Sequence, residues 1–344
     1  MGSSLGIKIL ALNGRQALKK YYWLCGLMLA MSYLAADEET THVLEFPANI
    51  SPWFTGPLIS PSAYTVPQVH VSLEPYFYFF DHTGVYNNHW KAHSRPHFHS
   101  NQFQLKIKMG VLPYLDLHVY PQVFYNTTQG RHYFNAGDLP IGINFQLLRS
   151  QLEDPWPAMK LALRANVPLG KFQHLRANRR RTDAIGSGSW QPAAGLVFSK
   201  LWHTSGIHFL EAFLSFNYQI GTRADVRGIN TYGGAPNTRG TVYPGNVFTV
   251  DGAFQYNFTQ RWAFTCDFIY QHNNKNRFSG KSGTLADGNR AAMRRPSREQ
   301  LSLAPGIEYS WSTSLGVIGG VWFTYAGRNS SRYTTPIIAL SIYI

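Results

Sequence analysis

Residues 158–169 read AMKLALRANVPL, a stretch in which apolar and polar side chains alternate. Met159 and Leu161 would point to one side of an extended chain, and Lys160 and Arg164 to the other. Successive side chains of a β-strand face opposite ways, so the stretch predicts a strand with one apolar and one polar face. In a soluble sandwich the apolar faces would meet in a core, whereas in a membrane barrel they would face lipid.

The first 36 residues have the layout of a secretory signal peptide. Four basic residues between positions 8 and 20 precede the apolar run 21–36, which ends in two alanines before three acidic residues. We therefore expect residues 1–36 to be a signal peptide; the alternative is a retained N-terminal anchor. No apolar run reaches the roughly 18 residues that a membrane helix needs.

The composition narrows the class of partner. The 344-residue chain has a formal net charge of +13 and 15% aromatic residues. A basic chain can bind nucleic acid, but secretion argues against that partner and favours anionic sugars, lipids or solutes. Cleavage would remove Cys25 and leave Cys266 without a disulfide partner.

Alternation of the same period recurs along most of the chain and predicts twelve strands. We expect them near residues 68–80, 99–110, 114–126, 136–148, 157–168, 188–201, 206–221, 245–257, 261–273, 299–311, 314–326 and 333–344. Short connections alternate with long polar ones, which are residues 81–98, 126–135, 169–187, 222–244, 274–298 and 326–332. This regularity is typical of an outer-membrane barrel with periplasmic turns and external loops. The predicted fold is therefore all-β: a transmembrane, antiparallel, up-and-down β-barrel over residues 68–344, with both termini in the periplasm of a Gram-negative bacterium.

Residues 37–67 are rich in proline and serine and show no clear periodicity. They would form either a periplasmic tail or a segment folded into the lumen. We expect the tail, because the segment lacks the bulk of a plug domain.

Aromatic residues sit toward the ends of the expected strands, where their rings favour the lipid headgroup level. The candidates for these girdles are Phe77, Phe79, Tyr125, Trp190, Trp262, Tyr270, Trp311 and Tyr325. The chain also stops within an alternating strand, 338–344, as expected of a protein read by the barrel-assembly machinery. Membrane lipid, lipopolysaccharide and that machinery are the expected partners.

If the apolar faces meet lipid, the polar faces line the lumen. A Lys or Arg on the lipid face at the midplane would cost roughly 2–4 kcal/mol, so this assignment is nearly forced. The predicted lumen-lining residues are Lys106, Lys108, His118, Asp138, Lys160, Arg164, Glu211, Asp251, Asp267 and Glu308. The bases come from early strands and most of the acids from later ones, which favours a narrow pore that orients polar solutes. The alternative is a lumen closed by side chains that pair across it.

Two loop features are weaker candidates for function. The external loops carry basic runs, Arg179, Arg180 and Arg181 in one and Arg294 and Arg295 in another, which could meet lipopolysaccharide or recruit anions. The alternative is ordinary solvated charge. His89, His93 and His97 are candidate metal ligands, but their spacing matches no defined site, so we expect no metal and no cofactor.

Enzyme motifs such as GxSxG, HExxH or a phosphate-binding loop are absent from the sequence. We therefore expect no catalytic residues and no enzymatic activity. An outer-membrane enzyme with a Ser/His or Asp/His pair near the outer rim is the remote alternative.

Several strand sequences resemble the outer-membrane family named for the meta-pathway of phenol degradation. The matching stretches are GDLPIG (137–142), PAMKLALRANVPLG (157–170), GSGSWQP (186–192), YNFTQRW (256–262) and LAPGIEY (303–309). Members are barrel transporters, some linked to the uptake of aromatic or other hydrophobic compounds. The resemblance, which covers residues 115–344, thus implies a channel that passes small solutes of this kind. The alternative is a closed structural or surface-interaction barrel whose basic loops matter.

Overall fold

The computed structural model describes residues 52–293 and 295–344. The predicted signal peptide and Arg294 lie outside the described residues. The described chain forms β1 (Val71–Tyr86), β2 (Ala92–Leu112), β3 (Leu115–Val119), β4 (Gln122–Thr128), β5 (Arg131–Ala136), β6 (Leu139–Leu148), β7 (Ala158–Val167), the 3-10 turn η1 (Ala177–Arg179), β8 (Gln191–Ser205), β9 (His208–Gln219), β10 (Ala224–Arg227), β11 (Arg239–Tyr243), β12 (Val247–Asn257), β13 (Trp262–Asn273), β14 (Arg277–Lys281), β15 (Arg298–Ser310), β16 (Leu315–Arg328) and β17 (Ser331–Tyr343). Within these ranges no helix is long and apolar enough to cross a bilayer.

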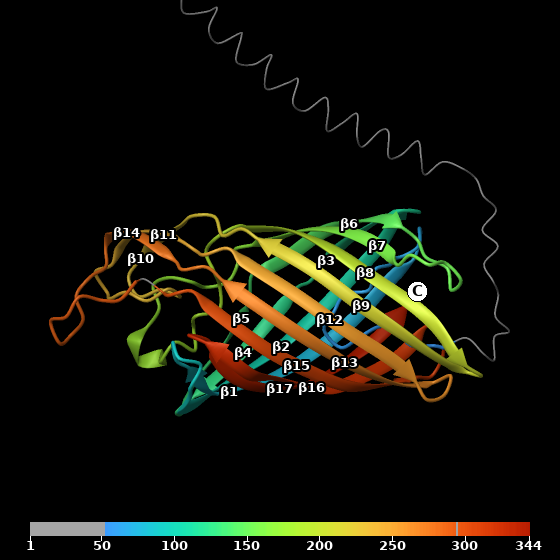
Figure 1. The fold of residues 1–344 in the computed structure, drawn as a ribbon. Coiled ribbons are helices and arrows are strands. Elements are labelled where there is room, and N and C mark those ends of the chain that lie inside the picture. Colours follow the sequence, from blue (N-terminus) through green and yellow to red (C-terminus); the bar gives the residue numbers. More distant parts are fainter. Residues whose placement is uncertain (1–51, 294) are drawn as a thin grey trace, which may run out of the picture. The chain divides into compact units, whose positions relative to one another are not determined.

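The strands close into an antiparallel barrel (Figure 1). β1 pairs with both β2 and the last strand, β17, which completes the ring. β3 and β4 pair with successive parts of β2 and count as one strand, interrupted at Pro121, which has no N–H to donate. β5 and β6 likewise form one strand, interrupted at Gly137 and Asp138. The ring therefore has twelve strands, which confirms the predicted all-β, antiparallel, twelve-stranded barrel.

The connections separate by length at the two ends of the barrel. Short turns lie at the end that also holds the C-terminus, on the right of Figure 1. Reciprocal backbone hydrogen bonds between Val71 and Ile344 bring the start of β1 and the end of β17 together at this end. We call it the short-turn end, and the opposite one the long-loop end.

Three of the six connections predicted as long loops are mostly strand. The expected loops 81–98, 126–135 and 326–332 contain the continuing hairpins β1–β2, β4–β5 and β16–β17, whose turns are residues 87–91, 129–130 and 329–330. Gln129, Gly130 and Asn329 have positive φ, as tight hairpin turns require. These hairpins continue past the apolar belt, so neither face is apolar and the sequence lacks a period-two signal there.

The other long connections fold together. β10 and β11 pair with β14 in a three-stranded sheet at the long-loop end (Figure 1). Its core contains Val226, Tyr232, Val242 and Met293. The basic loops are therefore part of a small folded cap, which the sequence did not predict because strands of four or five residues are too short to show a period.

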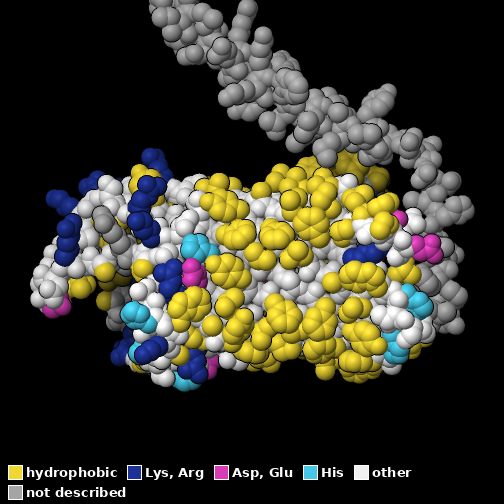
Figure 2. Space-filling view, viewed as in Figure 1, with side chains coloured by type: hydrophobic (Ala, Val, Ile, Leu, Met, Phe, Trp, Pro, Cys, Tyr) yellow, Lys and Arg dark blue, Asp and Glu magenta, His cyan; other side chains and the backbone are white. Residues whose placement is uncertain are grey.

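Hydrophobic side chains cover the barrel wall in a broad band, and Lys and Arg gather at the long-loop end (Figure 2). On β7, Lys160 and Ala162 are buried while Leu161 is only partly so, and the odd-numbered face thus points outward as predicted. The expected girdle residues Phe77, Phe79, Tyr125, Trp190, Trp262, Trp311 and Tyr325 are exposed, whereas Tyr270 is partly buried. A closed barrel with an apolar wall suits lipid, because all of its strands pair within the ring.

Residues 52–67 lie inside the barrel at the short-turn end. We call them the lumenal segment. Leu58 is fully buried against Tyr76, Tyr78 and Ile318 of the wall. Gly320 leaves room for it, since a Cβ there would lie 2.6 Å from Leu58 Cδ2. From the composition we expected a periplasmic tail, but residues 52–67 follow the alternative, a segment in the lumen. Single side chains and backbone hydrogen bonds hold the segment there, so its sequence shows no periodic pattern.

Candidate functional site

The inner wall brings charged side chains from separate strands into one row. Lys108 of β2 pairs with His118 of β3, which pairs with Gly142 of β6, which in turn pairs with Arg164 of β7. Because paired residues point to the same side of a sheet, these side chains face the lumen together. The His118 ring lies over Gly142, where a Cβ would be 2.2 Å from Nε2.

A cavity of about 660 Å³ lies in the lumen. The lumenal segment, from Thr55 to Pro67, borders it at the short-turn end. Its walls include Lys106, Lys108, Lys160, Arg164 and Asp251 of the predicted set. The cavity is thus the place where the predicted lumen residues meet open space.

Three of the cations that line the cavity have no ion-pair partner among the described residues: Lys106, Lys160 and Arg164. Lys106 Nζ lies 3.6 Å from the centre of the Tyr76 ring. Lys160 Nζ donates to the Tyr64 carbonyl of the lumenal segment at 3.2 Å. Nε of Arg164 is buried and has no hydrogen-bond partner. An anion entering the cavity would therefore find uncompensated donors.

The carboxylates in the cavity are more fully engaged. Lys108 Nζ pairs with Glu74 Oε1 at 2.5 Å. Asp116 accepts hydrogen bonds from Val66 N at 2.9 Å and Asn144 Nδ2 at 2.7 Å. Asp251 accepts one from Ser215 Oγ at 3.2 Å, and its Oδ1 has no partner. The cavity wall therefore offers free positive charge on β2 and β7, opposite a partly satisfied acid on β12.

Two other predicted lumen acids hold the lumenal segment. Glu308 Oε1 accepts hydrogen bonds from Thr55 N at 2.9 Å and from Thr55 Oγ1 at 2.7 Å. Asp267 Oδ1 accepts them from the backbone N–H groups of Ser60 at 2.7 Å and Ile59 at 3.2 Å. Both carboxylates are buried, and hydrogen bonds to a charged group are worth about 1.5–3 kcal/mol each. Their structural role is to anchor this segment rather than to present charge to a solute.

Of the remaining predicted lumen residues, Asp138 and Glu211 lie at other levels of the barrel, whereas His118 belongs to the row of Lys108 and Arg164. Asp138 accepts hydrogen bonds from Gly170 N at 2.9 Å and from Ser187 N and Oγ at 2.8 and 2.6 Å, so it holds the loop between β7 and β8. Glu211 is buried near the short-turn end of β9. His118 is buried and stacks on Tyr120 with 4.8 Å between ring centres.

The arginines of the basic loops at the long-loop end make specific contacts. Arg181 Nη2 donates to the Thr231 carbonyl at 2.6 Å, and Arg295 Nη2 donates to the same oxygen. Arg179 lies over the Tyr133 ring at 4.7 Å, whereas Arg180 is exposed. Burial and, after it, the charge of Arg181 lower the pKa of Arg295 to about 10, so Arg295 stays charged at neutral pH.

A second hollow, of about 400 Å³, lies toward the long-loop end. Arg295, Arg298 and Tyr232 border it, together with Asp138. A solute that enters from this end would meet these arginines before it reaches the cavity.

The structure separates the candidate metal ligands. His93 Nε2 and Asn87 Nδ2 lie 2.9 Å apart, and His89 lies in the exposed hairpin turn beyond them. His97 instead lies against His99, which belongs to the same histidine-rich stretch of sequence, and against Asp81, which the sequence did not single out. No loop spacing could reveal this group, because Asp81 and His99 meet through the register of β1 and β2.

One serine–histidine contact among the described residues lies toward the long-loop end, and the remote enzyme alternative called for such a pair near an outer rim. His82 Nδ1 and Ser331 Oγ are 2.9 Å apart. The ring of His82 also stacks on Phe80 and packs edge-on against Tyr333, with ring centres 5.8 and 5.6 Å away. This packing accounts for the position of the His82 ring.

The sequence did not predict which groups donate hydrogen bonds to Asp267 and Glu308. The donors are mainly backbone N–H groups of the lumenal segment, which every residue except proline possesses. Such donors leave no mark in a sequence. The only available signal was the proline-rich, extended character of residues 37–67, which suits a chain whose N–H groups bond to side chains instead of a sheet.

No protein-family model matches the chain, and no curated protein matches its sequence. Among solved structures, it is similar to the COG4313 outer membrane channel from Pseudomonas putida F1, with 10% identity and a TM-score of 0.64 over 85% of this chain and 100% of that one. Lower scores relate it to the NanC porin (10% identity, TM-score 0.42, 78% and 98% covered) and to a TodX monoaromatic hydrocarbon channel mutant (8%, 0.39, 82% and 91%). At 10% identity the likeness to the COG4313 channel shows the fold alone, which is a closed, antiparallel, twelve-stranded β-barrel.

Proposed function

We propose that this protein is an outer-membrane channel of a Gram-negative bacterium and passes small anionic solutes, carboxylates above all. The observation that carries the proposal is the set of three unpaired cations, Lys106, Lys160 and Arg164, around one lumenal cavity. At an effective dielectric constant of about 20, a carboxylate roughly 4 Å from a cation gains about 4 kcal/mol. This wall therefore favours an anion over a cation of equal size.

The cavity also suits an aromatic solute. Tyr76, Tyr78 and Tyr120 lie in its lining beside the cations. Their rings would stack on an aromatic group while the cations hold its carboxylate. The resemblance to the meta-pathway family supports the same class of solute.

In this proposal the short-turn end, with both ends of the barrel chain, faces the periplasm. The apolar belt contacts membrane lipid, and the basic cap meets the phosphates of lipopolysaccharide. A solute would then enter past Arg295 and Arg298 and leave beside the lumenal segment.

A closed barrel is the second candidate, and the lumenal segment favours it. This segment crosses the interior from Glu308 on β15 to Asp116 on β3, and wall residues hold it along its length. If this segment never leaves the lumen, no solute passes. The protein is then a structural or surface-interaction barrel whose basic loops carry the function.

The test compares three solutes of similar size in proteoliposomes: benzoate, benzylammonium and benzyl alcohol. Empty liposomes give the passive leak of each, which is large for the alcohol. The proposal predicts protein-dependent entry of benzoate that exceeds entry of benzylammonium. Equal rates of the two ions would contradict the anion preference, and rates no faster than empty liposomes would favour the closed barrel.

A further inference from the structure

We propose that Asp81, His97 and His99 form a binding site for a divalent transition-metal ion, with Zn²⁺ as the natural probe. The three side chains lie on the outward face of the β1–β2 hairpin, outside the lumen. Imidazole nitrogen together with carboxylate oxygen is a donor set that Zn²⁺ favours.

The strand register and a β-bulge bring the three ligands together. Asp81 on β1 is directly opposite His99 on β2, and His97 lies within the bulge of β2, with its Nδ1 2.8 Å from Asp81 Oδ1. His82 is opposite Phe98, so a regular ladder would place residue 96 opposite Gly84. Ser94 is there instead, which shows a shift in register. This β-bulge adds residues to β2 beside His97, and bulges commonly redirect a side chain.

The donor atoms converge on one point. His97 Nδ1 lies 2.8 Å from Asp81 Oδ1, and His99 Nδ1 lies 3.4 Å from the same oxygen. One donor atom from each of the three residues lies within 4.8 Å of the others. Zn²⁺ bonds of about 2.0–2.1 Å in a tetrahedron separate neighbouring donors by roughly 3.3 Å. Small rotamer adjustments would therefore admit the ion. Each ligating Nδ1 must be free of its proton, which moves to Nε2 or is released to water, and coordinate bonds then replace the contacts with Asp81.

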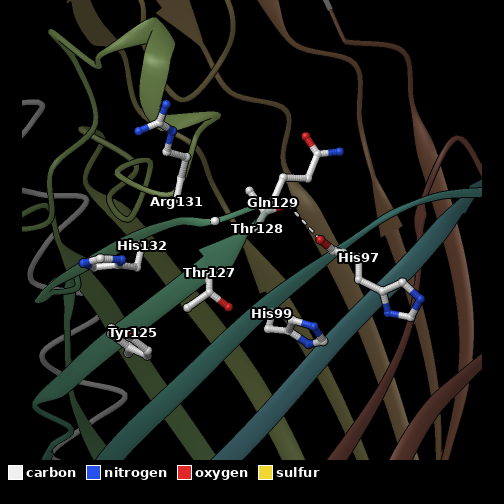
Figure 3. Close-up of a pocket in the computed structure, with 9 residues that line it drawn as sticks. His97, His99, Tyr125, Thr127, Thr128, Gln129, Arg131 and His132 are labelled. Atoms are coloured by element: carbon white, nitrogen blue, oxygen red, sulfur yellow. Dashed lines mark hydrogen bonds between the residues drawn. The ribbon is translucent and has the colours of Figure 1, made fainter.

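The site is open enough for an ion to enter. The side chains of His97 and His99 are about half exposed, and that of Asp81 is one-third exposed. Figure 3 shows the two imidazoles lying side by side, next to an open hollow of about 500 Å³ that Tyr125 and His132 also border. Thr128 Oγ1 donates to the His97 carbonyl at 2.8 Å and holds its backbone in place. Water can complete the coordination from this hollow.

The position suggests what the ion would do. Phe77 and Phe79 point outward below Asp81 on the same face of β1, and both are exposed as lipid-facing residues are. The site therefore lies at the edge of the apolar belt. An ion bound there would link β1 to β2 of this hairpin. Because the site is on the outer face, zinc binding and solute passage would succeed or fail independently.

The experiment is calorimetric titration of Zn²⁺ into the purified full barrel in detergent, prepared without a polyhistidine tag. We expect one saturable site per chain. Asp81→Asn and His99→Ala should each weaken it by roughly tenfold or more. His93→Ala is the matched control, since His93 is on the same strand but outside the group and should leave the affinity unchanged.

A spectroscopic readout separates loss of ligation from loss of folding. With Cu²⁺ as probe, electron paramagnetic resonance should show coupling to two nitrogens in the wild type and to one in His99→Ala. Each variant must also keep the heat-sensitive gel migration of a folded barrel. Absence of saturable Zn²⁺ binding by the folded wild type would overturn the proposal, as would full binding by folded His99→Ala.

Discussion

Leu58 is the apolar anchor of the lumenal segment. It is fully buried among side chains of β1, β15, β16 and β17, although its own segment has no hydrophobic pattern. Truncating a buried leucine to alanine costs about 2–5 kcal/mol, because the cavity left behind closes only partly. The hydrogen bonds to Asp267 and Glu308 would remain.

Leu58→Ala should therefore release the segment more often while the barrel stays folded. Each 2 kcal/mol lost raises the released fraction roughly 30-fold, and proteolysis follows that fraction when opening is fast. Limited digestion of the folded barrel measures it as faster cleavage within residues 52–67. Leu169→Ala, at an exposed leucine after β7, is the control. Equal cleavage in both variants would show that Leu58 is not the anchor.

Arg164 tests the charge of the cavity wall. Its guanidinium lies in the lumenal row and has no ion-pair partner among the described residues. Removing one of the three charges, where water in the lumen screens its attraction for a passing ion, loses roughly 1 kcal/mol of anion attraction.

Arg164→Gln should lower the chloride-to-potassium permeability ratio about fivefold, which corresponds to roughly 1 kcal/mol. The reversal potential under a salt gradient measures this ratio. Lys91→Gln, at the exposed tip of the β1–β2 hairpin, should leave the reversal potential unchanged. A larger shift for Lys91→Gln would place the selectivity outside the cavity.

At this scale alternation in the sequence predicts which face of a strand a side chain takes, and register decides which residues it contacts. Alternation alone put Lys160 and Arg164 on the face opposite Leu161, and the structure has them there. The engagement of Asp267 by the lumenal segment, and the meeting of Asp81 with His99, depend on register and on an aperiodic segment. Neither leaves a pattern along the chain.

The lumenal segment is the element that decides how far the lumen is open. Single contacts with several wall strands hold it, and no sheet pairing is formed. The wall strands make a complete hydrogen-bonded ring without it. The barrel should therefore tolerate its removal.

Deletion of residues 53–66 should leave a folded barrel and raise the single-channel conductance severalfold, because the widest obstruction is gone. Planar-bilayer recording gives the conductance, and the shift in gel migration on boiling verifies the fold. An unchanged conductance in a folded deletion variant would mean that the segment does not limit the path.

The projecting β1–β2 hairpin is an element with a different role. Its outer part, beyond the pairing of Gly84 with Ser94, continues the strands past the apolar belt. The sequence predicted a loop here because both faces are polar, and hydrophobic alternation is the main signal for a strand.

Replacing residues 85–93 with Asn-Gly should therefore keep the barrel folded, since this pair closes tight hairpins and the ring lies below it. The readout is the shift in gel migration on boiling, with the same deletion length taken from 72–80 as a control that destroys the ring. Loss of the shift in the shortened hairpin would show that the projection is needed for folding.

At the scale of the whole molecule, twelve strands, a closed ring and segregated turns follow from alternation and loop lengths in the sequence. Closure follows because β17 pairs with β1 and leaves no edge. The folded cap of β10, β11 and β14 and the occupied lumen did not follow, since they depend on contacts between distant segments. The sequence thus predicts the strands of the barrel wall better than it predicts the lumenal segment and the small sheet at the long-loop end.

The central claim is that the lumen is a path for small solutes. Single-channel recording of the full barrel in planar bilayers tests it most directly. The account predicts discrete, small conductance steps with a reversal potential on the chloride side of zero in a potassium chloride gradient. Folded protein that inserts into the bilayer yet gives no steps, both with and without residues 53–66, would contradict it.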